Sequence, residues 1–503
     1  MSLKRNILAS YGSQIYVTLL GIAMVPLYLR YMGIEAYGLV GLFVMLQAWF
    51  QLLDVGLTPT ISRETARYAA GAGNAIGLRR LLHLLEGFFV AVALLGAGAL
   101  AAGSSLVARN WLNVQHLPLP EVELAIRLMA VLVALRWISG LYRGAISGFE
   151  RFVWLSGFNA AIATARFVLV LPYFLFVGAS ATDFFRYQLV IAILELAVLV
   201  LYTYRLLPGV RGPAPAWHWQ ALRSALRFSL GIALTSSIWV LVTQTDKLLL
   251  SRLLPLSDYA YFTLAVLVAS SVMLISAPIS AAVLPRMTRL FAQGDDAGLI
   301  HVYRTATQLV GVIAVPATLV LAVFAQQVLW AWTGNAQVAE QAAPVLTLYV
   351  LGNGILALAA FPYYLQFAKG DLKLHIIGQV LFVVLLIPAL VAATMRWGMV
   401  GAGYAWLIAN SVYFVVWVPL IHRRFYADLH AQWLLRDLGP IVGFSVGGAF
   451  VAQLVFTPVT ERLATASNIA LVGIALLALA AGGSPWVRSS IGRQLRARVG
   501  RAA

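Results

Sequence analysis

The sequence predicts an all-α protein that crosses a membrane about fourteen times, and three observations support this fold class. Long apolar runs separated by short polar breaks follow one another along all 503 residues, and each approaches the roughly 20 residues that an α-helix needs to cross a bilayer. Hydrophobic residues make up 61% of the chain and charged residues only 11%, whereas a soluble domain carries about 25% charged residues. Lys and Arg gather in alternate breaks, as in multi-pass membrane proteins.

We predict the spans from these apolar runs. The first run begins near Ile7 and has no small-residue cleavage site, so we interpret it as a span rather than a signal peptide. None of the breaks is long enough to hold a soluble domain. The basic breaks receive about three times as many Lys and Arg as the others, which places both termini in the cytoplasm. The predicted spans are residues 7–30, 37–60, 82–103, 121–142, 153–178, 184–204, 226–250, 259–284, 305–326, 342–366, 374–394, 400–421, 438–458 and 466–483.

The chain also divides into two similar halves. A Pro- and Arg-rich segment at 205–223 reads as a cytoplasmic linker between an N-terminal six-helix lobe (1–204) and a C-terminal six-helix lobe (224–421). A shift of about 222 residues places the motif 30–37 on 252–259, so we predict two bundles related by a pseudo-twofold axis. Transporters often bind substrate between such repeats, although short turns and interfacial Tyr residues also recur by chance. Two additional spans (438–483) and a basic cytoplasmic tail (484–503) follow.

The composition excludes several functions. The net charge of +17 lies mostly in the breaks between spans, so it indicates membrane topology rather than nucleic-acid binding. Without cysteine, disulfides and thiolate chemistry are excluded, and the seven His residues show no metal-ligand spacing. We therefore expect no metal and no cofactor. The tail is interpreted as a solvated charged segment, with an amphipathic helix on anionic lipid as the alternative.

Buried arginines are the strongest functional signal. Arg136 and Arg166 lie deep within predicted spans, where a charge is costly and usually marks a pathway. Arg143 lies seven residues after Arg136 and shares its helix face. Guanidinium groups match phosphate oxygens bidentately, so the three define a candidate cationic cavity for an anionic group such as a phosphate. The alternative is a structural ion pair with Glu86 or Glu195, the acids in the third and sixth spans.

Other charges in the spans are candidates for gating or ion coupling, together with Glu86 and Glu195. Asp54 could titrate and couple transport to H⁺ or Na⁺. Alternatively, it could partner a basic residue at the inner gate or cap a helix broken at Gly56 and Pro59. Asp246 and Lys247 end the seventh span. Because adjacent helical residues point in different directions, we expect each of them to need its own partner, with Asp246 serving either as an outer gate or as an interfacial charge.

Three stretches carry a resemblance to a known family. Their order and spacing resemble the polysaccharide transporter, or O-antigen (Wzx-type) flippase, family of the multidrug/oligosaccharidyl-lipid/polysaccharide exporter superfamily. The similarity runs over most of the chain. The stretches are Asn6 to Gly38 with Leu53-Asp-Val-Gly-Leu57, Thr245 to Tyr259 with Pro285-Arg-Met, and Trp397-Gly-Met-Val-Gly-Ala-Gly403.

The resemblance implies a transporter rather than an enzyme. It implies that an undecaprenyl-diphosphate-linked oligosaccharide moves from the cytoplasmic to the outer leaflet by alternating access, and that cationic residues hold the diphosphate. Fourteen spans also resemble the lipid II flippase branch, in which two extra helices shape a groove for the lipid tail. Besides this lipid and the bilayer, polysaccharide polymerase machinery is a possible partner, and we expect a monomer. The rivals are an ion-coupled multidrug exporter and a membrane enzyme of glycan assembly, for which the loops are too short.

Overall fold

The computed structural model describes residues 3–209, 237–457 and 461–489. This part of the chain is almost wholly helical, and its only β-type pairing is an isolated bridge between Asn113 and Pro255. The chain divides into two compact units, Met1–Ala260 and Tyr261–Ala503. The predicted all-α membrane fold is therefore confirmed. The predicted linker at 205–223 and the tail at 484–503 lie largely outside the described residues.

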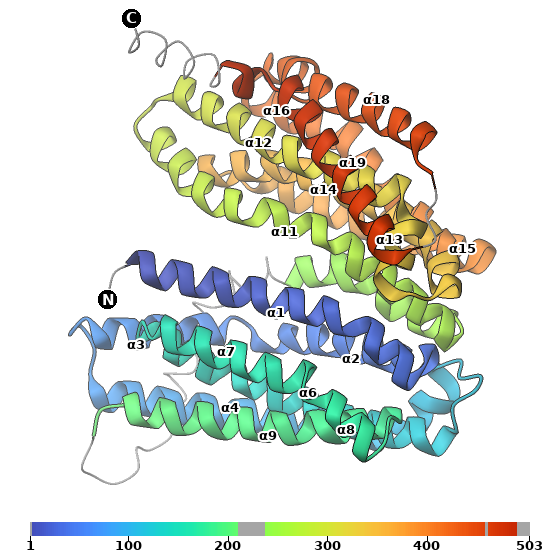
Figure 1. Ribbon diagram of the computed structural model, residues 1–503. Coiled ribbons are helices and arrows are strands. Elements are labelled where there is room, and N and C mark those ends of the chain that lie inside the picture. Colours follow the sequence, from blue (N-terminus) through green and yellow to red (C-terminus); the bar gives the residue numbers. More distant parts are fainter. Residues whose placement is uncertain (1–2, 210–236, 458–460, 490–503) are drawn as a thin grey trace, which may run out of the picture. The chain divides into compact units, whose positions relative to one another are not determined.

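The first unit is a bundle of long helices (Figure 1). Its centre is α6, which packs against α9, α4, α3 and α2. Local sequence sets the helix ends: Asn74 caps α4, and Ser180 forms a capping box with Asp183 at the start of α9. The helices are α1 (Leu3–Met32), α2 (Ile34–Phe50), a 3₁₀ turn (Gln51–Asp54), α3 (Leu57–Ala69), α4 (Ala75–Ala102), α5 (Ser104–Leu106), a π-helical turn (Val107–Trp111), α6 (Leu119–Gly148), α7 (Phe152–Phe167), α8 (Val170–Phe176), α9 (Ala181–Leu206) and a helix at 237–253.

The second unit contains most of α11 and the helices that follow it. Here α12 packs against α14, α18 and α19, while α14 also packs against α15. Asp295 and Asn335 cap α12 and α14 through their side chains. The helices are α11 (Leu256–Ala292), α12 (Asp296–Val323), α13 (Ala325–Thr333), α14 (Ala336–Lys369), α15 (Lys373–Val412), π-helical turns at Tyr413–Trp417 and Gln432–Leu438, α16 (Val418–Phe425), α17 (Leu429–Ala431), α18 (Gly439–Val455) and α19 (Arg462–Gly483).

Twelve stretches of the described chain are long and apolar enough to span a membrane. One of them, Lys373–Phe425, contains both the eleventh and the twelfth predicted spans. The backbone leaves helical geometry at Trp397 and Gly398, where Gly398 has a φ of 58°, a region that glycine enters without steric cost. The predicted span at 226–250 lies partly outside the described residues, so the total of fourteen stays a prediction.

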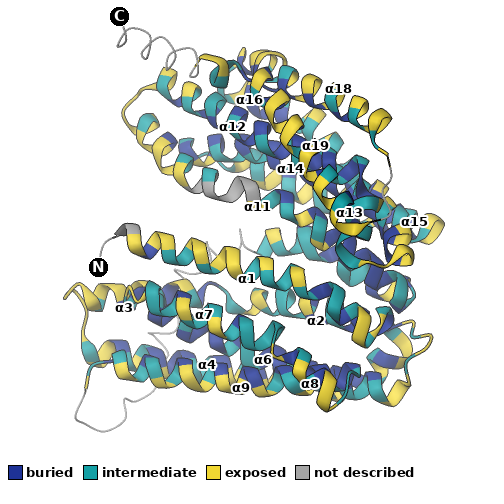
Figure 2. Ribbon diagram, in the orientation of Figure 1, coloured by how far each residue is buried: buried dark blue, intermediate teal, exposed yellow. Residues whose placement is uncertain are grey.

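Exposed apolar side chains cover the outer helix faces. Figure 2 shows exposed residues along α1 and α18, and they include Leu8, Leu19, Phe444 and Leu454. In water such a surface would be unfavourable, but it suits contact with lipid chains. The burial pattern therefore agrees with the membrane fold.

Close packing of α6 against α3 depends on glycine. A Cβ atom at Gly148 would lie 2.1 Å from the carbonyl oxygen of Ser62, and one at Gly144 would lie 2.8 Å from that of Thr58. Small residues spaced four apart let two membrane helices approach this closely. This contact fixes α3 beside the helix that carries Arg136 and Arg143.

We predict that Gly148→Ala destabilises the first unit. Although alanine is the better helix former, its methyl group would collide with the α3 backbone, and overpacking costs about 1–3 kcal/mol. Thermal unfolding of the purified protein in detergent measures the effect as a lower Tm. The control is Gly157→Ala on α7, where no atom lies within 4 Å of the added Cβ. Equal Tm values for the two variants would contradict the close contact.

Candidate functional site

The structure brings all three predicted arginines into the first unit. Arg136 and Arg143 project from α6, and Arg166 lies in the last turn of α7. All three are half-buried. Arg136 lies close enough to Arg143 and Arg166 for electrostatic interaction, and Glu195 on α9 is in range of Arg136 and Arg166. We call these three arginines the cationic cluster.

Neutral amides, rather than carboxylates, hold Arg136. Its Nη1 donates to Oε1 of Gln47 at 3.2 Å, and its Nη2 donates to Oε1 of Gln188 at 2.7 Å. The guanidinium carbon lies 4.8 Å from the ring centroid of Phe43, within the range of a cation–π contact. These contacts orient the guanidinium, and no carboxylate forms an ion pair with it in the described chain.

Arg143 forms the ion pair of the site. Its Nη2 lies 2.5 Å from Oε1 of Glu195, and its Nη1 donates to Oδ1 of Asn159 on α7. Only 4% of the Glu195 side chain is exposed, and its second oxygen, Oε2, has no hydrogen-bond partner within the described chain. The ion pair with Glu195, expected as the alternative for Arg136 and Arg166, is made by Arg143 instead and by neither of those two in the described chain.

Arg166 is the least satisfied member of the cluster. Within the described residues its guanidinium makes neither an ion pair nor a hydrogen bond, and its Nε atom is buried. The guanidinium carbon lies 5.4 Å from the ring centroid of Phe167. Its backbone carbonyl accepts a hydrogen bond of 2.9 Å from Nε2 of Gln188, the residue that also binds Arg136. Gln188 thus connects two arginines of the cluster.

The cluster has more cations than anions. Its three guanidinium groups have one adjacent carboxylate, Glu195, which pairs directly with Arg143. A partly buried excess of positive charge favours binding of an anion, and several guanidinium groups together match the oxygens of a phosphate or diphosphate. The arrangement offers recognition and positioning of an anionic group.

Glu86 lies in a different environment from the one predicted. Its Oε1 accepts hydrogen bonds from the hydroxyls of Tyr142 at 2.9 Å and Tyr204 at 3.0 Å, and its Oε2 accepts one from Tyr204 at 2.9 Å. The structure shows no ion pair between Glu86 and an arginine in the described chain. The ion-pair alternative was wrong for Glu86 because the two phenols occupy its carboxylate oxygens.

Asp54 ends the 3₁₀ turn and caps the next helix. Its Oδ1 accepts from the backbone nitrogen of Thr58 at 3.1 Å and from the Thr58 hydroxyl at 2.6 Å. Between them, Val55 and Gly56 adopt positive φ angles of 46° and 75°, so the chain changes direction before α3. Of the alternatives for Asp54, the structure shows the capping contact. It shows no ion pair of Asp54 with a basic residue of the described chain, and a role in ion coupling stays a prediction.

Asp246 and Lys247, for which we expected separate partners, also contact each other. Nζ of Lys247 lies 3.6 Å from Oδ1 of Asp246 and also donates to the carbonyl of Thr243 at 2.5 Å. The long, flexible lysine side chain folds back toward its neighbour, which the helical direction of the Cβ atoms did not anticipate. A gating role for the pair stays a prediction.

Sequence reasoning missed Gln47 and Gln188. These two amides, which orient Arg136, lie on α2 and α9. A glutamine within an apolar span indicates a buried polar contact. The sequence does not show which residue the glutamine contacts. The contacts join residues 89 and 52 positions apart in the sequence, so only the tertiary fold brings them together.

The second unit holds its buried charge in a closed network. Arg304 forms a bidentate pair with Asp437, with distances of 2.6 and 3.0 Å. Gln308 donates to Asp437 at 2.8 Å, and its Oε1 accepts from the Ser484 hydroxyl at 2.8 Å. These contacts tie α12 to the segments before α18 and after α19. Because Arg304 is paired in this way, we assign the network a structural role.

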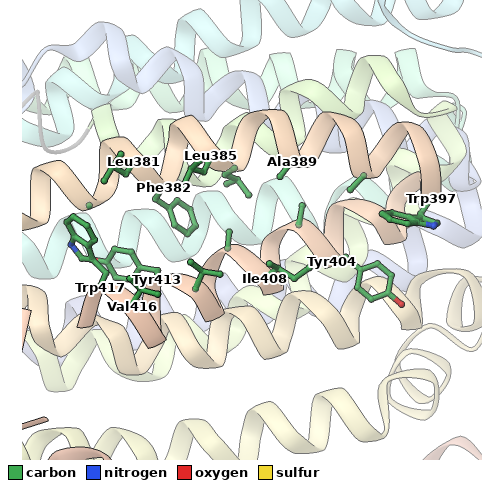
Figure 3. A pocket seen from close by; sticks show the side chains of 16 residues that line it. Leu381, Phe382, Leu385, Ala389, Trp397, Tyr404, Ile408, Tyr413, Val416 and Trp417 are labelled. Carbon is green, nitrogen blue, oxygen red and sulfur yellow. The ribbon is translucent and has the colours of Figure 1, made fainter. Parts of the chain in front are cut away.

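An apolar groove runs along α15 (Figure 3). The two halves of this helix lie antiparallel, and the groove between them has a volume of about 460 Å³. Its floor includes Ala389, and aromatic rings stand at both ends, with Trp397 at one and Trp417 at the other. Such a surface suits the hydrocarbon chain of a lipid. The resemblance placed a lipid groove at the two extra spans instead, and a groove at those spans stays a prediction.

Comparison with known proteins places this architecture in a class. The fold matches the structure described as "Lipid II flippase MurJ, inward closed conformation" with a TM-score of 0.74 and 14% identity, over 98% of this chain and 100% of that one. It matches an inward-facing multidrug resistance transporter of the MATE family, from the same exporter superfamily, with a TM-score of 0.62 and 17% identity, over 82% and 96%. These likenesses show the fold: the chain shares the helical architecture of these two membrane transporters.

Family models give the particular assignment. The model described as "Polysaccharide biosynthesis protein" matches residues 3–291, and that described as "Lipid II flippase MurJ" matches residues 173–467. The chain belongs to these flippase families, which are transporters and not enzymes. It is also 20% identical to a protein of Shigella flexneri described as "Putative O-antigen transporter", over 81% of this chain and 95% of that protein. The predicted family is confirmed.

We predict that Arg143→Met strongly destabilises the protein. The substitution leaves the carboxylate of Glu195 buried without its cation, and breaking a buried pair in this way costs about 3–5 kcal/mol. Thermal unfolding in detergent should show a lower Tm for this variant, and the double variant Arg143→Met/Glu195→Gln should recover most of the loss. If the single variant is as stable as the wild type, the ion pair does not support the fold.

We predict that Asp54→Asn retains both stability and transport, because asparagine provides the same capping acceptor. Asp54→Ala removes the acceptor and should cost about 1 kcal/mol, measured by thermal unfolding. Transport is measured as surface glycan in a flippase-deficient strain. A folded Asp54→Asn variant without transport would show that the protein needs the titratable carboxylate itself.

Proposed function

We propose that the protein is a flippase for an undecaprenyl-diphosphate-linked oligosaccharide and moves it from the cytoplasmic to the outer leaflet of the bacterial inner membrane. The families support transport of a lipid-linked glycan. The observation that carries the choice of an anionic head group is the cationic cluster. Three half-buried guanidinium groups with a single adjacent carboxylate suit a diphosphate better than a neutral or cationic molecule.

Each arginine contributes differently in this proposal. Arg166, which has no polar side-chain partner in the described structure, is free to bind phosphate oxygens. Arg136 keeps its orientation through Gln47 and Gln188 while its charge acts on the same anion. Arg143 shares its charge with Glu195, so the diphosphate competes with this carboxylate. The oligosaccharide follows the diphosphate while the prenyl tail stays in lipid.

Glu195 is our candidate for ion coupling. Its Oε2 is buried and has no partner among the described residues, which makes it an acceptor for H⁺ or for a bound Na⁺. Neutralising Glu195 would release Arg143 to hold the diphosphate, so cation binding and substrate binding would be coupled. Alternating access of the two units then carries the head group across the membrane.

A multidrug exporter is the second candidate, because MATE transporters share the fold. Cationic drugs require an anionic or aromatic site. The cationic cluster has the opposite sign, and this observation favours the lipid-linked substrate.

We predict that Arg166→Gln abolishes transport without destabilising the protein. The side chain makes no folded-state ion pair in the described structure, so its removal should leave the Tm unchanged while a diphosphate contact is lost. Complementation of a flippase-deficient strain, scored by surface glycan with expression checked, measures transport. Binding of inorganic pyrophosphate to the purified protein in nanodiscs should weaken about tenfold, equivalent to loss of one charge-assisted hydrogen bond.

The matched control is Arg186→Gln on α9, whose side chain is 55% exposed and pairs with Asp183. It removes the same charge from the same unit and should retain transport. Normal transport and pyrophosphate binding by Arg166→Gln would overturn the diphosphate assignment of this residue. A wild-type protein that exports cationic dyes but does not restore surface glycan would favour the drug exporter.

A further inference from the structure

A pocket lined mainly by polar residues lies in the first unit, at the N-terminal end of α1. It has a volume of about 520 Å³ and is lined by the start of α1 together with the turn that joins α6 to α7. Asn6, Ser10 and Gln14 follow one another at intervals of four residues, so they share one face of α1. Glu150 and Phe152 contribute from the turn.

The polar side chains of this pocket have no partners among the described residues. In the described part of the chain, no side-chain hydrogen bond or ion pair involves Asn6, Ser10, Tyr11, Gln14 or Glu150. Asn6 is the decisive residue because it is only 9% exposed and its Oδ1 atom is buried without a hydrogen-bond partner. A buried amide oxygen left unsatisfied costs about 1–3 kcal/mol, and a ligand that donates a hydrogen bond would remove this cost.

The composition of the pocket identifies the chemistry of the ligand. Two amides, two hydroxyls and one carboxylate provide both donors and acceptors, as clustered sugar hydroxyls require. The rings of Tyr11 and Phe152 add apolar surface, which is typical of small-molecule sites. The Glu150 carboxylate would repel a phosphate. Its backbone has a φ of 57°, a costly conformation for a non-glycine residue that is found at ligand sites.

We propose that this pocket binds the glycan of the lipid-linked substrate before translocation. The inference rests on the proposed function for the identity of the substrate. With the N-terminus in the cytoplasm, the pocket opens where the substrate is assembled. Phe152 in the pocket and Asn159, the partner of Arg143, lie seven residues apart on α7, or about 10 Å along the helix. A diphosphate at the cationic cluster therefore places its attached sugars near the pocket.

The test is direct binding of glycans to the purified full chain in nanodiscs. Saturation-transfer NMR with a panel of free disaccharides, covering hexoses, N-acetylhexosamines and uronic acids, reports glycan binding. Inorganic pyrophosphate is measured separately as the probe for the cluster. The variants are Asn6→Leu, Gln14→Ala and Glu150→Gln. Matched controls are Gln341→Ala and Glu340→Gln, which alter the same residue types at exposed positions of α14.

We expect the wild type to bind at least one disaccharide, and the pocket variants to bind it about tenfold more weakly, as loss of a ligand hydrogen bond predicts. The controls should bind normally, and pyrophosphate binding should be unchanged in every pocket variant. Absence of disaccharide binding by the wild type, or normal binding by folded pocket variants, would overturn the pocket. Free disaccharides carry no diphosphate, so their binding does not depend on the cationic cluster. The proposed function is tested separately by pyrophosphate binding, which Arg166→Gln should weaken and the pocket variants should not.

Discussion

The first unit depends on keeping three arginines charged inside a membrane protein. Burying a guanidinium is costly unless hydrogen bonds and nearby charge compensate for the lost water. Arg136 is compensated by the amides of Gln47 and Gln188, which stabilise the cation without neutralising it. A carboxylate at either position would have closed the site into an ion pair. Because amides carry no charge, the positive charge of Arg136 stays available to an anion. The two amides come from α2 and α9, which pack against α6.

The packing of α6 makes this arrangement possible. Gly144 and Gly148 bring α3 against one face of the helix, and the cap that Asp54 provides starts α3 at the right place. On another face, α9 carries both Gln188 and Glu195, which contact Arg136 and Arg143. Residues that do not touch the proposed substrate therefore fix the geometry of the cluster.

The sequence predicted the features that depend on local pattern. It did not predict the contacts between residues far apart in the chain. The helical membrane fold follows from composition, and the cap at Asp54 involves residues only four positions apart. Both could therefore be predicted from the sequence. Gln47 and Gln188 were not, because their partner lies 89 and 52 positions away. The pairing of Asp246 with Lys247 was missed for a different reason: Cβ directions do not determine where a long lysine side chain ends.

The two units handle buried charge in opposite ways, and this difference bears on mechanism. In the second unit, Arg304 forms a bidentate ion pair with Asp437, and Gln308 connects this pair to Ser484. The charge of Arg304 therefore serves to hold α12, α18 and α19 together. In the first unit, Arg166 is left without a polar side-chain partner among the described residues. In the proposed function, a diphosphate bound within the first unit alone would keep its contacts throughout transport. Alternating access would then not require the head group to be released in transit.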